Sequence, residues 1–363
     1  MKNTFGNNIS VTLFGESHGP VIGAVMDGLS AGVKIDYDRI RKELDKRRPA
    51  GPISTKRRED DEFEIVSGVK DGFSTGAPIT VLIENKDVSS KDYSLIADMP
   101  RPSHADYVAG VKYGQYRDYR GGGHFSGRLT APIVAMGAIL IGALENKGIQ
   151  IGTHIKNLHG KLDRDFTDIS SDIRLLADKS FPALDESSEE EMVEEILKAS
   201  KCGDSVGGVL ESAVIGLPAG VGEPWFDSLE GTLSHILFSI PGIKGVEFGL
   251  GFGFAERYGS EANDPFCTDG EKIFTKTNNS GGINGGISNG MPIIFRVAVR
   301  PTPSIYKDQE TVSLSKMENS VLKIEGRHDP AIIHRARAVV DAVTAIAVAD
   351  ALSSAYGTSY LGG

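Results

Sequence analysis

The segment GESHGP, Gly15–Pro20, follows an apolar run and places a histidine, His18, in a tight glycine-flanked turn. An imidazole titrates near neutral pH, so a histidine that is held rigidly but accessibly suits the role of a general acid. The neighbouring Ser17 could donate a hydrogen bond to an anion or to a substrate hydroxyl. The structural alternative is a turn histidine that is satisfied by its own loop. The segment therefore indicates a candidate acid within a site that other segments must complete.

Two basic runs, DKRRP and TKRRED, contribute Arg47, Arg48, Arg57 and Arg58. A guanidinium is a planar, permanently charged fork that matches carboxylate or phosphate oxygens in pairs. The alternative is an ordinary solvated helix end, which is the usual fate of such a run. Binding to a nucleic acid is disfavoured, because acidic residues interleave with the basic ones.

A third segment, Met99–Arg128, is the richest in groups that could bind an anion. Its candidate groups are three consecutive glycines together with Arg101, His104, Arg120, His124 and Arg128. Backbone amides of a glycine-rich stretch can point at an anion, and a helix predicted to begin near Ser126 would add its positive end. The segment is not a Walker loop, because no GKS or GKT closes it.

The fourth segment, GRHDPAIIHRAR, places Arg327 and Asp329 directly before a helix predicted to begin at Pro330. Proline is favoured at the first helical position. Asp329 would then be either the N-cap of that helix or a carboxylate that accepts a proton in a pocket. Other motifs are absent from the sequence. There is no Rossmann fingerprint, no HExxH zinc motif, no GxSxG nucleophile elbow and no CxxC spacing around Cys202 or Cys267.

Composition limits the class of protein. The net charge of −10 argues against general binding to nucleic acid. The charge is uneven, because Lys34–Arg58 carries ten basic and four acidic residues, whereas Lys161–Leu197 carries four basic and twelve acidic ones. The longest apolar run, Ala131–Leu144, has 14 residues, against about 20 for a membrane span. Together with the absence of a signal-like start, this predicts a cytoplasmic protein that makes no membrane contact and builds an anion pocket.

The elements that must position these groups follow from apolar periodicity. Strands are predicted at Ile9–Phe14 and Val21–Met26, and further strands at FEIV and PITVLIE. Helices are predicted after an N-cap at Asp36, from Arg128 to Asn146, after a capping box of Ser188 and Glu191, from about Asp227 to Ser239, and from Pro330 to about Tyr356.

An internal repeat sets the expected fold. VIGAVMDGLSAGV at Val21 matches VLESAVIGLPAGV at Val209 at six of thirteen positions, which is either chance or a duplicated unit. No linker of low complexity divides the chain. We therefore predict an α+β fold, with residues 1–363 in one compact domain. It would have two pseudo-related halves, about 9–150 and 205–355, and an acidic insert near 161–201. The expected architecture is a β-α-β sandwich, with helices packed between antiparallel sheets.

The segments together resemble the chorismate synthase family. GESHGPVIGAVMDGLSA, GGHFSGRLTAPIVAMGA and RHDPAIIHRARAVVDAV resemble its N-terminal, central and C-terminal signatures. DKRRP, IENKDVSSKDYS, RPSHADY, YGQYRDYRGGG, SIPGIKGVEFG, GGINGGISNG and RPTPSI also resemble family segments in the expected order. The resemblance covers nearly the whole chain and leaves mainly the acidic region 163–201 unassigned.

The resemblance implies the conversion of 5-enolpyruvylshikimate-3-phosphate to chorismate and phosphate. This reaction is the last common step of the shikimate pathway, which leads to the aromatic amino acids. It is a 1,4-elimination that requires reduced FMN (FMNH2) without net redox change. The catalytic residues would be His18, His104 and Asp329. The substrate ligands would be Ser17, Arg47, Arg48, Arg101, Arg128 and Arg327. The flavin contacts would be Arg47, His124, Phe125, Ser126, Pro241, Gly242, Gly285, Arg300, Pro301, Thr302, Pro303, Ser304 and Arg327.

The chain departs from the family pattern in two places. Many members read GGGRSSAR where this chain reads GGGHFSGR, so His124 and Phe125 stand where those members have an arginine and a serine. The stretch after DKRRP is one residue shorter than in some members, and Pro52 or Ile53 lies nearest to an arginine found there. The family is typically a homotetramer, and we expect an external flavin-reducing system, because no NADPH-binding fingerprint is present. The alternatives are a nucleic-acid-binding protein and a flavin-binding protein without elimination activity.

Overall fold

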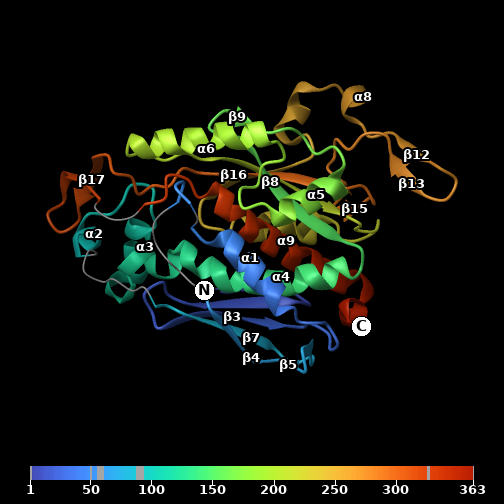
Figure 1. The fold of residues 1–363 in the computed structure, drawn as a ribbon, viewed down its shortest axis with the longest axis horizontal. Coiled ribbons are helices and arrows are strands. Elements are labelled where there is room, and N and C mark those ends of the chain that lie inside the picture. Colours follow the sequence, from blue (N-terminus) through green and yellow to red (C-terminus); the bar gives the residue numbers. More distant parts are fainter. Residues whose placement is uncertain (1, 50, 55–60, 87–93, 325–327, 363) are drawn as a thin grey trace.

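The fold is a sandwich in which a layer of helices lies between two antiparallel sheets (Figure 1). The computed structural model describes residues 2–49, 51–54, 61–86, 94–324 and 328–362. The first sheet has the order β1 (Thr4–Phe5), β2 (Ser10–Gly15), β3 (Val21–Asp27), β7 (Ile79–Glu84) and β4 (Phe63–Ser67). The second has the order β9 (Lys161–Leu162), β8 (Gln150–Leu158), β10 (Gly208–Ile215), β16 (Ile293–Val299) and β11 (Ile243–Phe248). The predicted α+β class is confirmed.

The strands form where the sequence alternates. In β7, the residues Ile79, Val81 and Ile83 are buried and the residues between them are partly exposed, which is the period of two expected for a half-buried strand. β16 alternates in the same way, with Ile293, Phe295, Val297 and Val299 facing the core. One face of each sheet therefore packs on the helical layer.

Besides their strand order, the two sheets share a turn that is held by the hydroxyl of a serine. Ser74 Oγ accepts a hydrogen bond from Val33 N at 2.9 Å and donates one to Ser30 O at 2.6 Å. Ser288 Oγ accepts a hydrogen bond from Val221 N at 2.9 Å and donates one to Pro218 O at 2.6 Å. Both serines therefore fix the turn after the matched strand, β3 in the first sheet and β10 in the second. Duplication of one unit stays a prediction, and these matched bonds support it.

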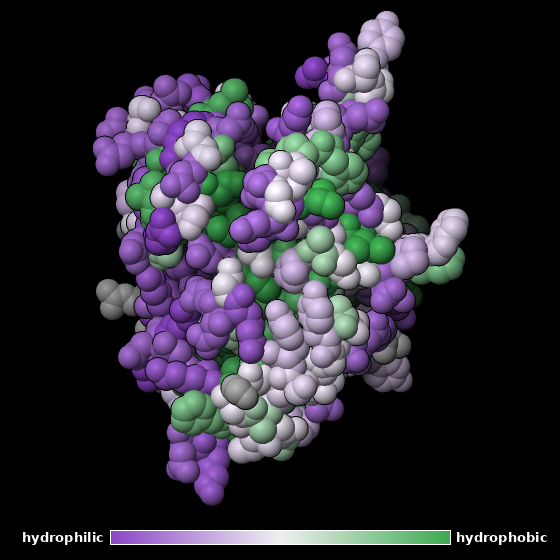
Figure 2. All heavy atoms as spheres, turned by 90° about the vertical axis from the view of Figure 1, so that its right-hand side faces the viewer, coloured by the Kyte–Doolittle hydropathy of each residue, from purple (hydrophilic) through white to green (hydrophobic). Residues whose placement is uncertain are grey.

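The middle layer is built on two apolar helices, α4 (Thr130–Glu145) and α9 (Ile333–Tyr356). α4 packs against β3 and β7, and α9 packs against β8 and β10, while α1 (Tyr37–Arg47) and α7 (Leu229–Leu237) lie beside them. Both long helices are apolar enough to cross a membrane, but 83% of each such stretch is buried inside the fold. The face drawn in Figure 2 is largely covered by hydrophilic and weakly apolar side chains. α4 and α9 are therefore core helices.

The end of α9 holds the start of the chain. The carboxylate of Asp350 accepts hydrogen bonds from the backbone amides of Asn7, Asn8 and Ile9 at 3.0, 2.7 and 2.9 Å. These amides precede β2, so the C-terminal helix fixes the entry of the chain into the first sheet.

The acidic region folds as two helices, α5 (Ile169–Asp178) and α6 (Glu186–Lys201), and α5 packs on β8 and β10. α6 is seen above the second sheet in Figure 1. The remaining helices and hairpins are shorter. They are α2 (Ser94–Asp98), α3 (Asp106–Tyr113), α8 (Gly259–Ala262), β5 (Val69–Lys70) with β6 (Phe73–Ser74), β12 (Phe266–Thr268) with β13 (Ile273–Thr275), β14 (Ile283–Asn284) with β15 (Ile287–Ser288), and β17 (Gln309–Ser313) with β18 (Glu318–Leu322).

Two predicted helix starts were wrong. α6 begins at Glu186 after an N-cap at Asp185, so Ser188 lies inside the first turn and forms no capping box. Asp185 stands at the N-cap position, but its side chain makes no capping hydrogen bond and pairs with Arg164 Nε at 3.1 Å instead. α9 begins at Ile333 rather than at Pro330. Asp329 is not its cap, because its carboxylate is paired with Arg335 at 2.7 Å. The N-cap at Asp36 is confirmed, since its side chain accepts hydrogen bonds from the amides of the first turn.

The crossing of α4 and α9 depends on a glycine. A Cβ atom on Gly137 would lie 2.3 Å from Ala342 Cβ and 2.4 Å from Ala342 Cα. We predict that Gly137→Ala destabilises the protein by about 1–3 kcal/mol, because overpacking must push the two helices apart. Gly142→Ala is the matched control on the same helix, where the new Cβ would meet only the Arg39 side chain at 3.5 Å. The control should be neutral or stabilising by up to about 1 kcal/mol. Urea unfolding of both variants measures the difference, and equal stabilities would contradict the tight crossing.

Candidate active site

Two adjoining pockets lie where the ends of several helices meet. The smaller pocket encloses about 310 Å³, and we call it the arginine pocket. It is lined by Arg47, His104, Phe125, Ser126, Arg128, Pro241, Gly242, Arg300–Ser304, Asp329 and Arg335, among others. Most of the residues predicted from the sequence to form a site are thus brought together. They come from the end of α1, the start of α4, the loop after α7, the segment after β16 and the start of α9.

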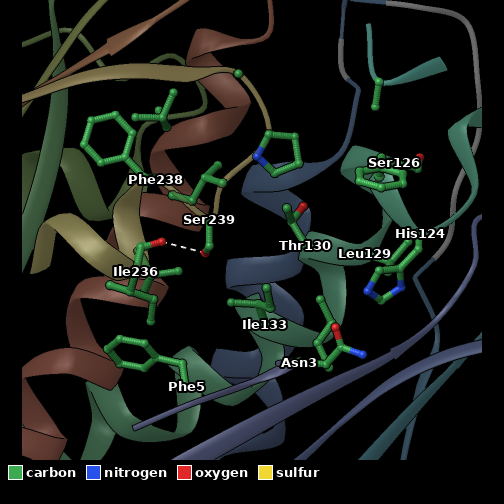
Figure 3. A pocket seen from close by; sticks show the side chains of 18 of the residues that line it. Asn3, Phe5, His124, Ser126, Leu129, Thr130, Ile133, Ile236, Phe238 and Ser239 are labelled. Carbon is green, nitrogen blue, oxygen red and sulfur yellow. Dashed lines mark hydrogen bonds between the residues drawn. The ribbon is translucent and has the colours of Figure 1, made fainter. Parts of the chain in front are cut away.

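The larger pocket encloses about 680 Å³, and we call it the apolar pocket. It shares His104, Phe125, Ser126 and Arg300 with the arginine pocket. Figure 3 shows apolar side chains of Phe5, Ile236 and Phe238 on one side of it, with His124 and Ser126 across the cavity. Among the described residues that line the two pockets, Asp329 is the one carboxylate, in a chain whose net charge is −10. The cavity is therefore strongly cationic.

Arg47 and Arg128 form the polar wall of the arginine pocket. Both are buried, with 4% and 8% of their surface exposed, and a buried guanidinium needs hydrogen-bond partners to offset the loss of water. Arg47 donates from Nε to Thr130 Oγ1 at 2.9 Å and Arg128 donates from Nε to Asn85 Oδ1 at 3.1 Å. The Asp61 carboxylate lies between the two arginines and pairs with both. A basic run that could have been a solvated helix end is in fact part of the site.

The glycine-rich loop packs against His18 and Ser17. Gly121, Gly122 and Gly123 all have positive φ angles, of 56°, 92° and 55°, a region that favours glycine. A Cβ atom on Gly121 would lie 2.1 Å from His18 Cε1 and 2.9 Å from Ser17 Oγ. Both side chains are buried, and Ser17 Oγ lies 3.1 Å from His18 Nδ1. His18 and Ser17 do not line the arginine pocket themselves, but they lie directly behind Gly121, which does.

His104 is held by a carboxylate on its own loop. Its Nδ1 lies 2.7 Å from Asp106 Oδ1, and Arg101 binds the same carboxylate from Nε and from a terminal nitrogen at 2.7 and 2.8 Å. Burial alone would raise the pKa of Asp106, but the hydrogen bonds from Arg101 and His104 outweigh it and hold that pKa well below its usual range. Because Nδ1 is hydrogen-bonded to Asp106, Nε2 is the ring nitrogen on the side of Gly122. A Cβ atom on Gly122 would lie 3.5 Å from it. The bond to Asp106 thus fixes the orientation of the ring, with Nε2 on the side of Gly122.

Asp329 belongs to the pocket and is fixed by α9. Arg335 donates to its carboxylate at 2.7 Å and, through Nε, to the backbone oxygen of Arg47 at 2.7 Å. One arginine thereby connects the start of α9 to the end of α1. The next residue back, His334, is buried, and this burial lowers its pKa to about 3. Its Nε2 lies 2.9 Å from Ser54 Oγ, so it acts as a neutral structural link.

The residues predicted as flavin contacts form the wall opposite α1. Arg300 N donates to Gly242 O at 2.9 Å, which ties the segment after β16 to the loop after α7. Among the described residues, Thr302 has a buried hydroxyl with no hydrogen-bond partner. Such an orphaned group beside a cavity suits a polar ligand. Burial lowers the pKa of Arg300, whose guanidinium also donates to Ser103 O.

Other predicted residues lie apart from the pocket lining. Arg48 ends α1 and pairs with Asp45 at 2.6 Å, and Gly285 lies in the turn between β14 and β15. Arg101 acts on Asp106 rather than lining the pocket, and Arg327 lies outside the described residues. At the departures from the family pattern, His124 Nδ1 lies 2.9 Å from Gly15 O, and Phe125 lines both pockets.

Sequence reasoning missed Asp61, Asp106, Thr130 and Arg335. Asp106 was findable, because it lies two residues after His104 and begins a helix. Arg335 was findable as a cation one turn into a helix that was already expected. Asp61 gave no signal, since it is one of several acids in the run REDDE and its role depends on a long-range contact. Among the described residues, no group of three histidine, cysteine or acidic side chains could hold a metal ion.

An α+β fold with a cationic pocket at the meeting of helix ends defines an enzyme-type site for a small, highly charged anion. The chain belongs to the chorismate synthase family, whose sequence profile matches residues 9–353. It is similar to the chorismate synthases of Thermococcus kodakarensis, 46% identical over 347 residues, and Thermococcus gammatolerans, 48% identical over 347 residues. Both matches cover 96% of each chain. A solved structure described as the crystal structure of chorismate synthase matches with a TM-score of 0.76 and 30% identity, over 96% of this chain and 93% of that one.

The contact between Gly121 and His18 can be tested directly. We predict that Gly121→Ala lowers turnover about 10- to 100-fold, because the new Cβ must displace the His18 ring, a candidate acid. Gly114→Ala is the matched control, since Gly114 also has a positive φ, of 60°, but nothing lies within 4 Å of its Cβ position. The control carries the greater backbone strain, because Gly114 has a ψ of −142°, in a region nearly restricted to glycine, whereas Gly121 has a ψ of 13°. A loss of turnover confined to Gly121→Ala therefore cannot come from backbone strain. Equal turnover in the two variants would show that displacing the His18 ring with a Cβ atom at position 121 does not affect turnover.

Proposed function

We propose that this chain catalyses the elimination of phosphate from 5-enolpyruvylshikimate-3-phosphate to give chorismate, with reduced FMN as cofactor. The proposal rests on one observation above all. In a member of the chorismate synthase family, Arg47, Arg128 and Arg335 converge on a pocket that also holds His104 and Asp329. The substrate carries two carboxylates and a phosphate, so fixed cations in a partly closed cavity stabilise both the bound anion and the departing phosphate.

The reaction breaks two bonds of the substrate ring and forms one. The C–O bond to phosphate breaks, and the phosphate leaves with the electron pair of that bond. A C–H bond at the other end of the allylic system also breaks, and its electron pair forms a new double bond, while the existing ring double bond shifts by one position toward the carbon that loses phosphate. No electrons are gained or lost overall. The chain must therefore hold the anion, receive a proton and stabilise the leaving group.

The residues of the pocket divide these tasks. Arg47 and Arg128 would hold anionic groups of the substrate. His18 would be the acid near the leaving phosphate. It lies behind the Gly121 backbone, with Ser17 beside it. His104 would hold or move a proton through Nε2, because Asp106 occupies Nδ1. Asp329, placed by Arg335, would accept a proton in the pocket.

The same cavity suits a flavin. The unpartnered Thr302 hydroxyl, the Arg300 guanidinium and the adjoining apolar pocket offer polar, cationic and apolar surfaces together. Residues 300–304, Pro241, Gly242 and Ser126 would hold it. When bound, reduced FMN would supply electron density that assists the cleavage of the C–O bond and is returned before the cycle ends.

The setting of the enzyme is also part of the proposal. We place it in the cytoplasm, with an external source of reduced flavin and with no nucleic-acid or membrane partner. We further propose a homotetramer. Aromatic side chains stand largely exposed on the single chain, among them Trp225 at 86%, Phe226 at 96% and Phe252 at 87%. Large exposed apolar groups of this kind are typical of surfaces that another chain covers.

The decisive assay is anaerobic. Purified protein, FMN and substrate should form chorismate and phosphate in equal amounts after reduction with dithionite or light. The same mixture with NADPH alone should form neither, because the sequence has no dinucleotide fingerprint. Steady turnover with NADPH would show a second, reductase activity. Flavin binding without product would indicate the alternative of a flavoprotein that lacks elimination activity, and salt-dependent binding of RNA or DNA would favour the nucleic-acid alternative.

The two histidines should matter for chemistry and little for folding. We predict that His18→Ala and His104→Ala each lower turnover about 10²- to 10⁴-fold, the usual contribution of a positioned acid or base. His159→Ala is the control, because His159 is largely exposed and is paired with Glu195 far along the chain from the site. Stopped-flow measurement of chorismate formation gives the rates. Wild-type turnover in either variant would exclude that histidine from the mechanism.

A further inference from the structure

Asp61 occupies an unusual position behind the arginine pocket. Its side chain has no exposed surface, and each of its two oxygens pairs with a different guanidinium. Oδ2 accepts from Arg47 at 2.8 Å, and Oδ1 accepts from Arg128. Its backbone has a φ angle of 43°, in the left-handed region that few residues other than glycine adopt and that aspartate tolerates. A buried carboxylate is thus held in a specific backbone conformation between two cations that face a ligand cavity.

Both arginines also have hydrogen-bond partners other than Asp61. Arg47 also donates to Thr130 Oγ1 at 2.9 Å and to Gly127 O at 3.2 Å. Arg128 also donates to Asn85 Oδ1 at 3.1 Å and to Glu84 O at 3.3 Å. All four of these acceptors are neutral. Asp61 differs from these four acceptors in its negative charge, which offsets part of the charge of the two guanidiniums.

We propose that Asp61 is an internal counter-ion that lowers the affinity of Arg47 and Arg128 for phosphate, so that the phosphate product can dissociate. The inference rests on the proposed function, in which a phosphate group is released inside this pocket. Without the charge of Asp61, two buried arginines would hold a free phosphate dianion more strongly, because charges interact strongly where water is excluded. Asp61 keeps the cations paired when no anion is bound, and it competes electrostatically with any anion on the pocket side. It acts through the arginines and does not touch the reacting atoms.

This role predicts a gain of binding, which a purely structural role cannot produce. Asp61→Asn keeps the size of the side chain and removes its charge. We expect the variant to bind inorganic phosphate about 10-fold more tightly than the wild type in calorimetric titration. In the turnover assay, kcat and KM should both fall, because the anionic substrate and product are both held longer. Weaker or unchanged phosphate binding in a folded Asp61→Asn variant would overturn the proposal.

Two control variants separate charge from placement. Asp172→Asn removes another buried carboxylate that pairs with an arginine, Arg164, away from the pocket, and it should leave phosphate affinity unchanged. Thr130→Val removes the hydroxyl that orients Arg47, so it should weaken phosphate binding about 2- to 10-fold. The variants Asp61→Asn and Thr130→Val are thus expected to move phosphate affinity in opposite directions. A loss in both would mean that Asp61 only positions the arginines.

A second pair of variants covers the case in which Asp61→Asn fails to fold because the two cations have lost one negative charge between them. Arg128→Gln removes one of those cations, and the double variant Asp61→Asn with Arg128→Gln restores the balance. The double variant should bind phosphate more tightly than Arg128→Gln alone, and the reverse order would overturn the proposal. Phosphate titration needs neither flavin nor turnover. A chain that fails to make chorismate would contradict the proposed function and still leave the role of Asp61 to be decided.

Discussion

The structure is organised by the need to bury cations in the middle of the protein. A guanidinium that leaves water must be given acceptors, and for Arg47 and Arg128 these come from α4, from the end of β7 and from the segment before β4. Arg335 then connects α9 to the end of α1. The partners of three arginines therefore determine where the ends of α1, α4, α9, β4 and β7 meet. The sandwich of two sheets provides the rigid walls that keep those ends in place.

The position of the pocket also follows from the helical layer. The first turns of α4 and α9 both border it, through residues 127–130 and 332–336. The unpaired amides at a helix start carry partial positive charge, which adds to the field of the arginine side chains. The acidic helices α5 and α6 lie on the second sheet, away from this cavity. The chain can thus be acidic overall while its active site is cationic, since the opposite charges are kept in different layers.

Sequence predicted the parts of this arrangement that depend on local pattern. The strands β2, β3 and β7, the cap at Asp36 and the core helices followed from periodicity and capping chemistry. The start of α9 did not, since the helix begins at Ile333 with Ile332 at its N-cap position, and Asp329 pairs with Arg335 instead. The role of Arg47 as a buried residue, and that of Asp61 beside it, also escaped prediction. Both depend on contacts between segments 14 to 83 residues apart, which no local spacing encodes.

The hydrogen bonds from the amides of Asn7, Asn8 and Ile9 to Asp350 have a consequence for how the chain folds during its synthesis. The first sheet is made early on the ribosome, but its entry strand is fixed by a helix that comes more than 300 residues later. The same helix fills the centre of the core. Residues before α9 must therefore wait, with their apolar faces incompletely covered, until residues 333–356 have emerged. Such a chain has a long exposure during translation, and chaperones that hold nascent apolar segments would act on it throughout that interval.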